Sequence, residues 1–186
     1  PYYDWNPSPV VEREGYYREG TSNYVPHAYT QGLTDSGSNA STWRTDARAI
    51  DIVTKSSPFD IDMDVNLNGN TISGTVEVQS ATDVKNDLFK LYIVISHDYS
   101  EYSAPNGQTV FHQVFIDFVT SGELLSLSSG ESITKNINWT LDSNWPNDSG
   151  VSWDASDLNI LAFVQYDGSG PVYRKIYQVE EVDFGS

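Results

Sequence analysis

The sequence of 186 residues contains no cysteine. This absence excludes disulfide exchange, thiolate catalysis, zinc–thiolate centres and c-type haem attachment within these residues. The chain therefore folds without a disulfide, and its hydrophobic content of 38% is enough for a buried core. Cysteine usage leaves the cellular compartment open.

Basic residues are scarce. Ten Lys and Arg stand against 26 Asp and Glu, which gives a formal net charge of -16. A chain with this charge repels phosphate backbones and anionic lipids, so we expect no nucleic-acid partner. Because 13% of the residues are aromatic, the composition also differs from that of disordered acidic tails. The sequence predicts a folded acidic domain.

Long apolar runs are missing as well. No run approaches the roughly 20 residues that cross a bilayer, so no membrane span is predicted. The sequence opens at Pro1, without an initiator Met, and is rich in Ser, Thr, Asn, Asp and Tyr. These features favour an exported protein, extracellular or on the cell surface, from which an upstream segment has been removed. Trimming of an intracellular protein is the alternative.

From Phe59 onward the sequence has the period of β-strands. Apolar and polar residues alternate over 59–67 and 71–78, and Asn68-Gly69 supplies a turn, which predicts a hairpin with one face in water. Residues 88–96 are more continuously apolar, as expected of a central strand covered on both sides.

The remaining segments complete the pattern. Residues 110–119 indicate a strand or a short amphipathic helix, 132–141 a strand, and 158–166 with 172–179 a second hairpin. About seven strands separated by turns predict an antiparallel, Ig-like β-sandwich over residues 57–186. We expect its core to depend on Ile93 and Phe163.

The first 56 residues differ in kind. They are rich in Tyr, Gly and Ser, and contain one predicted helix over about residues 42–53, capped by Ser41 or Thr42. The Lys55–Pro58 stretch is the expected boundary with the sandwich.

Several short motifs together resemble a known family. Residues 13–18 (REGYYR) and 24–32 (YVPHAYTQG) resemble the second half of a thioredoxin-like domain. Further segments (SPFDI at 57–61, KLYIVI at 90–95, VFHQV at 110–114 and NILAFVQ at 159–165) are similar to the outer-membrane-protein-twenty-eight-related family. In that family a thioredoxin-like domain precedes a C-terminal β-sandwich on exported or surface proteins.

The resemblance implies a partial thioredoxin-like α/β segment over residues 1–56, with a cis peptide at Val25-Pro26 that shapes a groove for extended peptide. The alternative is an ordinary trans proline in a loop. The family's upstream portion, which would carry any redox cysteine pair, is absent here, so thiol oxidoreductase activity is not implied. Family members are surface-exposed or adhesion-associated proteins.

No catalytic site is predicted. His27, His97 and His112 are widely separated, no His pair has metal-ligand spacing, and no Gly-x-Ser-x-Gly elbow occurs. We therefore expect no enzyme and no required cofactor.

One loop suits calcium. Asp142, Asn144 and Asp148 place oxygen ligands close together, as Ca²⁺ requires, although the spacing is not that of an EF-hand. A solvated acidic loop is the alternative.

Asn39, Asn138 and Asn147 begin N-glycosylation sequons, and we expect Asn39 and Asn147 in the more exposed loops. Three matches in an Asn-, Ser- and Thr-rich chain also arise by chance.

The leading hypothesis for function is self-association of a structural protein. Tyr2, Tyr3 and Trp5 offer aromatic anchors and Pro7 and Pro9 keep Pro1–Val11 extended, so we expect this segment to dock on a neighbouring copy and build a filament or surface layer. The second hypothesis is a carbohydrate-binding or adhesive module, calcium-dependent or not, that uses the aromatics around Trp145 and Trp153 and has glycans or surface proteins as partners. The third is a peptide-binding groove beside Pro26.

Overall fold

The computed structural model describes residues 28–30, 34–37, 39, 41–46, 57–84, 88–104, 107–145, 150–168 and 174–185. This part of the chain is mainly β. Its strands are β1 (Ala28–Thr30), β2 (Thr34–Gly37), β3 (Phe59–Asn68), β4 (Thr71–Ser80), β5 (Phe89–His97), β6 (Ser100–Glu101), β7 (Val110–Phe111), β8 (Val114–Leu124), β9 (Ser132–Thr140), β10 (Ser152–Trp153), β11 (Leu158–Tyr166) and β12 (Ile176–Asp183).

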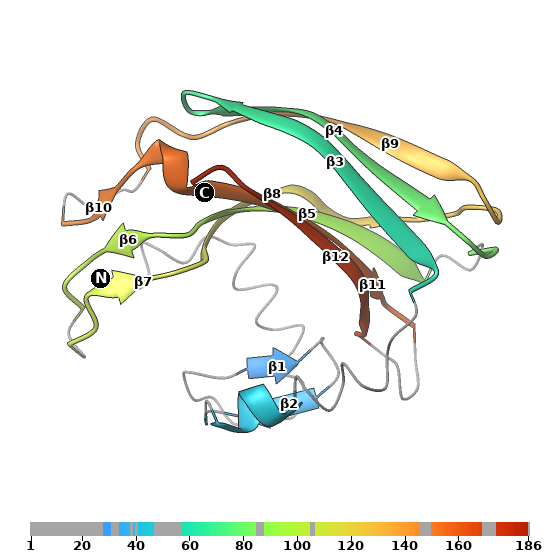
Figure 1. Ribbon diagram of the computed structural model, residues 1–186, viewed down its shortest axis with the longest axis horizontal. Coiled ribbons are helices and arrows are strands. Elements are labelled where there is room, and N and C mark those ends of the chain that lie inside the picture. Colours follow the sequence, from blue (N-terminus) through green and yellow to red (C-terminus); the bar gives the residue numbers. More distant parts are fainter. Residues whose placement is uncertain are drawn as a thin grey trace.

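Two antiparallel sheets face each other (Figure 1). One has three strands in the order β3-β4-β9, and the other has four in the order β12-β11-β5-β8. The predicted sandwich is confirmed. β5 lies inside the four-stranded sheet, as its continuous apolar sequence predicted.

The first hairpin is also confirmed, with a turn one residue later than predicted. β3 and β4 pair without interruption from Phe59 opposite Ser80 to Asn68 opposite Thr71, so the two loop residues are Gly69 and Asn70. Gly69 has a φ of 59°, and a glycine with positive φ at the first central position is typical of a type II′ turn.

Gly74 is required inside β4. Its φ is 143°, and a Cβ atom built there would lie 2.0 Å from the backbone oxygen of Asp64 on β3. Only glycine allows this close approach of the two strands. In the predicted alternation Gly74 stands in the same series as Ile72, Val76 and Val78. It contributes a close backbone contact there and no side chain to the core.

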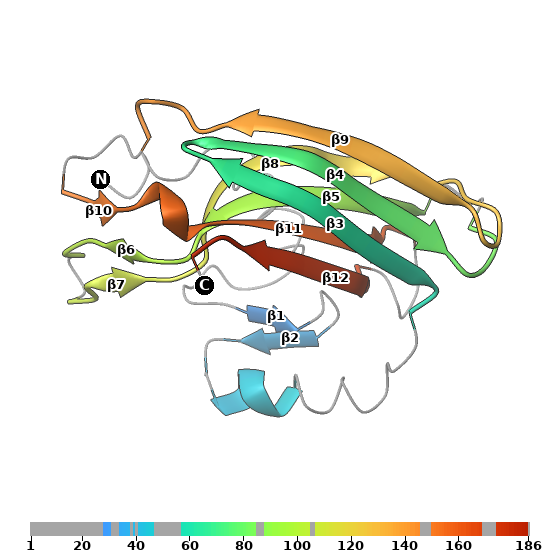
Figure 2. The same cartoon turned by 45° about the horizontal axis from the view of Figure 1, so that its top comes forward.

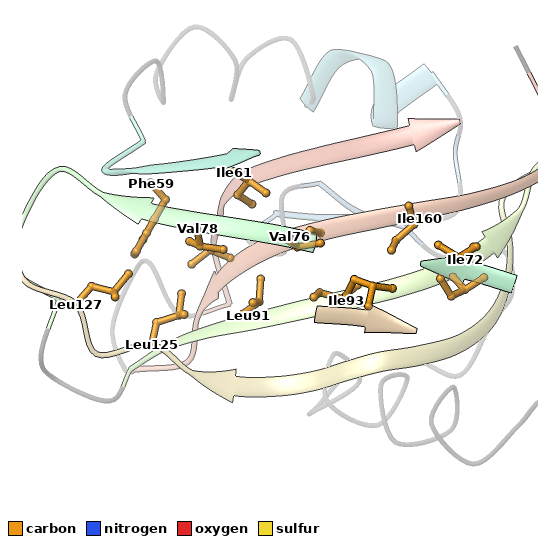
Figure 3. Packing of buried hydrophobic residues seen from close by; sticks show 14 of the residues in the cluster. Phe59, Ile61, Ile72, Val76, Val78, Leu91, Ile93, Leu125, Leu127 and Ile160 are labelled. Atoms are coloured by element: carbon orange, nitrogen blue, oxygen red, sulfur yellow. The ribbon is translucent and has the colours of Figure 1, made fainter. Parts of the chain in front are cut away.

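The core fills the space between the sheets (Figure 3). Alternate residues of each strand point inward because successive side chains of a strand lie on opposite faces. The three-stranded sheet contributes Ile72, Val76 and Val78, and the four-stranded sheet contributes Leu91, Ile93, Ile95 and Ile160, all fully buried. Val84 and Leu127 form an isolated antiparallel bridge and also lie in the core.

Phe163 does not belong to this core, so that prediction was wrong. Its neighbours Ala162 and Val164 face inward, which places Phe163 on the outer face of the four-stranded sheet. There its ring stacks on Tyr92 with the centroids 5.0 Å apart and the planes at 12°.

The segment 110–119 is strand rather than helix. It begins as β7 and continues as β8 after Gln113, whose φ of 53° breaks the strand. In the second hairpin β11 has the predicted bounds, whereas β12 begins at Ile176. Residues 41–46 are helical, as predicted for the start of that segment, and residues 47–53 lie outside the described part.

Polar contacts join the two sheets at the edge formed by β8 and β9. Trp139 Nε1 donates a hydrogen bond to Asp117 Oδ2 at 2.9 Å, and Lys135 forms an ion pair with Glu123. Charged side chains on edge strands oppose pairing with a further strand. This edge is therefore poorly suited to adding a strand from another chain.

The β1–β2 hairpin lies on the far side of the four-stranded sheet from β3, β4 and β9 (Figures 1 and 2). Val25 and Pro26 fall outside the described residues, as do residues 47–56 at the expected domain boundary. The thioredoxin-like segment and the division at residue 57 remain predictions. Within the described residues, no helix is long and apolar enough to cross a membrane.

Replacing Ile93 by Ala should lower the free energy of unfolding by about 2–5 kcal/mol, because a fully buried side chain is lost and a cavity remains. Thr134→Ala, on the exposed face of β9, is the matched control and should change it by less than about 0.5 kcal/mol. Urea denaturation measures both. Equal effects of the two substitutions would contradict this assignment of the core.

Candidate functional site

At one end of the sandwich the chain forms a small antiparallel sheet, here called the distal sheet, from β10, β6 and β7 in that order (Figures 1 and 2). Trp153 pairs with Ser100, which pairs with Phe111 on its other side. Because β6 follows β5 after only two residues, the position of the distal sheet depends on how β5 ends.

His97 is the last residue of β5 and is fully buried. Its Nε2 lies 2.6 Å from the backbone oxygen of Asp154, and its Nδ1 lies 2.9 Å from Ser100 Oγ. A carbonyl oxygen only accepts, so Nε2 carries the proton, and in the neutral ring Nδ1 accepts from the Ser100 hydroxyl. His97 thus joins the sandwich to the distal sheet. No sequence pattern indicates this link, because Asp154 lies 57 residues away.

Two tryptophans pack around this histidine. The ring centroids of Trp145 and Trp153 lie 5.5 and 5.7 Å from that of His97, and 4.9 Å from each other at an interplanar angle of 86°. Both side chains are half-buried. Their rings pack against one another and against His97, which gives these residues a structural role. That they also stack on sugars stays a prediction.

A shallow groove of about 380 Å³ runs along the distal sheet. Its lining is mostly polar and consists of Glu101, Tyr102, Ser103, Thr109, Val110, Gly150 and Ser152. Hydroxyl groups and one carboxylate can exchange hydrogen bonds with a polyol or a peptide.

Tyr99 is the exposed aromatic residue beside this groove, with 40% of its surface accessible. Its hydroxyl donates a hydrogen bond to Glu101 Oε1 at 2.7 Å. This bond, and then the negative charge of Glu101, raise the pKa of the Tyr99 phenol above its ordinary value. The ring of His112 packs edge-on against Tyr99, with the centroids 5.9 Å apart.

A second polar cluster spans the four-stranded sheet near the same end. Gln113 Nε2 donates to Asp98 Oδ1 at 3.3 Å and to Glu181 Oε1 at 3.2 Å, while its Oε1 accepts from Ser96 Oγ at 3.0 Å. Asn159 Nδ2 also donates to Glu181, at 3.2 Å. The amide of Gln113, the residue before β8, therefore connects β5 and the turn after it with β12 from a left-handed backbone conformation.

The predicted calcium loop is only partly described. Asp142 Oδ1 accepts hydrogen bonds from the backbone N–H and the Nδ2 of Asn144, at 2.8 and 2.9 Å, so Asn144 turns a donor rather than an oxygen toward it. Asp148 lies outside the described residues. Among the residues the structure does describe, no group of three or more His, Asp or Glu side chains is placed to hold a metal ion. Calcium binding stays a prediction.

Two of the three sequons can be located. Asn39 is exposed, and its Oδ1 accepts from the backbone N–H and the hydroxyl of Ser41, at 3.0 and 2.8 Å. Asn138 is exposed on the outer face of β9, in a strand rather than a loop. Asn147 lies outside the described part. Their glycosylation stays a prediction.

The residues expected to drive self-association, Tyr2, Tyr3, Trp5, Pro7 and Pro9, also lie outside the described part of the chain.

Three solved structures are among those similar to this chain. HBP35 of Porphyromonas gingivalis superimposes with a TM-score of 0.67 at 14% sequence identity, over 97% of this chain and 59% of HBP35. A domain of the outer membrane lipoprotein Omp28 from the same organism gives a TM-score of 0.42 at 12% identity, over 68% of this chain and 88% of that domain. Spo0M, a sporulation control protein from Bacillus subtilis, also gives 0.42, at 13% identity over 69% of this chain and 49% of Spo0M.

No protein-family model and no curated protein sequence matches the chain. At 14% identity the similarity to HBP35 shows a common fold, and the chain spans about three-fifths of that protein. The class defined by the described part is therefore an HBP35-like antiparallel β-sandwich with a distal sheet at one end.

Replacing His97 by Leu should lower the free energy of unfolding by about 1–3 kcal/mol, because the buried Ser100 hydroxyl loses its partner. Tryptophan fluorescence should change too, since Trp145 and Trp153 contact the imidazole. His112→Leu is the matched control, because 62% of that side chain is exposed, and should be near neutral. If the two variants unfold alike, His97 does not join the two sheets.

Asp154 should make stability depend on pH. It caps the short 3-10 helix η2 (Ala155–Asp157), and its Oδ1 accepts from the backbone N–H of Ser156 at 2.9 Å and from that residue's hydroxyl at 2.8 Å. The backbone bond first, and then the hydroxyl bond, lower the pKa of the Asp154 carboxyl. A lowered native pKa stabilises the fold above the pKa of the unfolded chain, and this contribution is lost as pH falls through the native pKa.

Asp154→Asn keeps a capping side chain but removes the charge. The variant should unfold at lower urea concentration than the parent at neutral pH, and the difference should vanish at strongly acidic pH. A difference that stays constant with pH would show that the carboxylate charge plays no part.

Proposed function

We propose that this chain is a non-enzymatic module of an exported, cell-surface protein. The observation that carries the proposal is the use of its histidines: both ring nitrogens of buried His97 are engaged in structural hydrogen bonds, and His112 is exposed. The buried residues of the described part also include no Asp, Glu or Lys, so no buried carboxylate or amine there offers a general base. The abundance of Ser, Thr, Asn, Asp and Tyr and the resemblance to the outer-membrane-protein-twenty-eight-related family support the location.

The module self-associates through its N-terminal segment, as a subunit of a filament or surface layer. Pro1–Val11 supplies three aromatic anchors and three prolines. The polar contacts of Trp139 and Lys135 disfavour pairing with another chain at the β8–β9 edge, which favours a contact through a different part of the chain. A net charge of -16 on every copy opposes close approach, and association should therefore strengthen with salt.

Replacing Tyr2, Tyr3 and Trp5 together by Ser should lower the mass of the assembly measured by light scattering, because interface energy concentrates in aromatic anchors. Tyr99→Ser, which removes an exposed aromatic residue from the distal sheet, is the control and should leave the mass unchanged. A parent chain that is monomeric at every concentration and salt, or a triple variant that assembles fully, would refute this mode of association.

The groove of the distal sheet favours carbohydrate binding as a second candidate function. Its lining combines hydroxyl groups, the ring of Tyr102 and the Glu101 carboxylate, which accepts a hydrogen bond from the exposed Tyr99. Sugars are bound by such combinations of hydrogen bonds and aromatic contact. This location differs from the one predicted around Trp145 and Trp153, which stays a prediction. Pro26 lies outside the described residues, so peptide binding beside it remains a prediction.

A glycan array probed with the parent chain should give signals that Tyr99→Ala and Glu101→Gln both reduce at least tenfold, equivalent to about 1.4 kcal/mol. Ser132→Ala, exposed on the other sheet, is the control. Repeating the array with calcium and with chelator tests whether the Asp142 loop contributes. An array without signal, or signals insensitive to both substitutions, would exclude this function for the groove.

A further inference from the structure

Two carboxylates meet at the polar cluster around Gln113. Gln113 Nε2 donates to Asp98 Oδ1 at 3.3 Å and to Glu181 Oε1 at 3.2 Å, so a single uncharged amide nitrogen lies between two negative groups. The two carboxylate oxygens are no farther apart than the sum of these distances. At such a separation like charges repel each other, and a cation between them would be attracted by both.

The protein itself neutralises these two charges weakly. Within the described residues, the one ion-pair partner of Asp98 is His112, whose Nδ1 lies 3.7 Å from Asp98 Oδ1, and Glu181 has no ion-pair partner. The side chains of His112 and Asp98 are 62% and 42% exposed, so water screens their contact. The two carboxylates therefore retain most of their attraction for a cation.

Beside Glu181 lies a buried oxygen atom without a hydrogen-bond partner. Asn159 is 1% exposed, and its Nδ2 donates to Glu181 Oε1 at 3.2 Å. The Oδ1 atom of the same amide group is buried and accepts no hydrogen bond from the described residues. A buried carbonyl oxygen without a partner destabilises a fold, and a bond to a cation would remove that cost.

The oxygen atoms of this cluster match the ligands that Ca²⁺ prefers. Ca²⁺ takes about six to eight oxygens from carboxylates, amide carbonyls and water. Asp98 and Glu181 supply carboxylates, and Asn159 supplies its unpartnered amide oxygen. Because Glu181 is exposed, water can complete the coordination.

Gln113 can supply a further oxygen ligand. Half a rotation of its amide exchanges Nε2 and Oε1, which turns the oxygen toward the two carboxylates and the nitrogen toward Ser96 Oγ. The Ser96 hydroxyl, which now donates to Gln113, can accept from the nitrogen instead. The exchange therefore keeps the bond to Ser96, and a bound cation would favour it.

We propose that one calcium ion binds in this cluster, with ligands from Asp98, Gln113, Asn159 and Glu181. The described part groups no three acidic or histidine side chains, so the amide oxygens are a necessary part of the site. The site is separate from the loop at Asp142, and it is independent of the proposed self-association.

Calorimetric titration of the full chain with calcium chloride, after treatment with a chelator, tests the proposal. Glu181→Gln keeps the shape of the side chain but removes one ligand charge, and should weaken calcium binding by roughly tenfold or more. Asp142→Asn, in the other loop predicted to hold calcium, is the matched control and should leave this binding unchanged. Urea denaturation of both variants without calcium checks that they fold as the parent does.

The side-chain amide signals of Gln113 and Asn159 in nitrogen-15 spectra give a second readout. Both should shift as calcium is added to the parent chain and stay in place in Glu181→Gln at the same calcium concentration. The proposal is overturned if the parent binds no calcium, if binding depends on Asp142 rather than on Glu181, or if neither amide signal moves.

Discussion

The contact between the inner faces of the two sheets is the interaction on which the rest of the structure depends. The chain has no disulfide, so the buried Ile, Val and Leu side chains of β4, β5 and β11 have to hold the two layers together. Each sheet alone would expose its apolar face to water. Both sheets, and the loops and sites that they carry, are therefore folded only while this apolar contact is intact.

His97 connects the distal sheet to the sandwich. It is the last inward-facing residue of β5, and its two hydrogen bonds hold β6 and the segment before η2 in place. Burying a polar group destabilises a fold unless its hydrogen-bond partners are present. The two partners of His97 therefore restrict the position of the distal sheet more than apolar packing alone would. Tyr99 and Glu101 can therefore be held at a defined position beside the groove while remaining exposed to a ligand.

The sequence predicted the parts of the fold that depend on local patterns. The β3–β4 hairpin follows from strict alternation and a glycine turn, and β5 from its unbroken apolar run. Phe163 was assigned to the wrong face because β11 is apolar on both faces, so periodicity alone could not orient it. The role of His97 depends on its contact with Asp154, 57 residues away, and Trp145 packs on Trp153 across a separation of eight residues. Neither leaves a periodic pattern in the sequence.

Native-state hydrogen exchange tests most directly whether the two sheets are stable only together. The slowest amides of β4 and of β5 belong to opposite sheets and should exchange with the same free energy, equal to that of global unfolding, because neither sheet persists without the other. If the slowest amides of one sheet exchange at a clearly lower free energy than those of the other, one layer unfolds independently and the account is wrong.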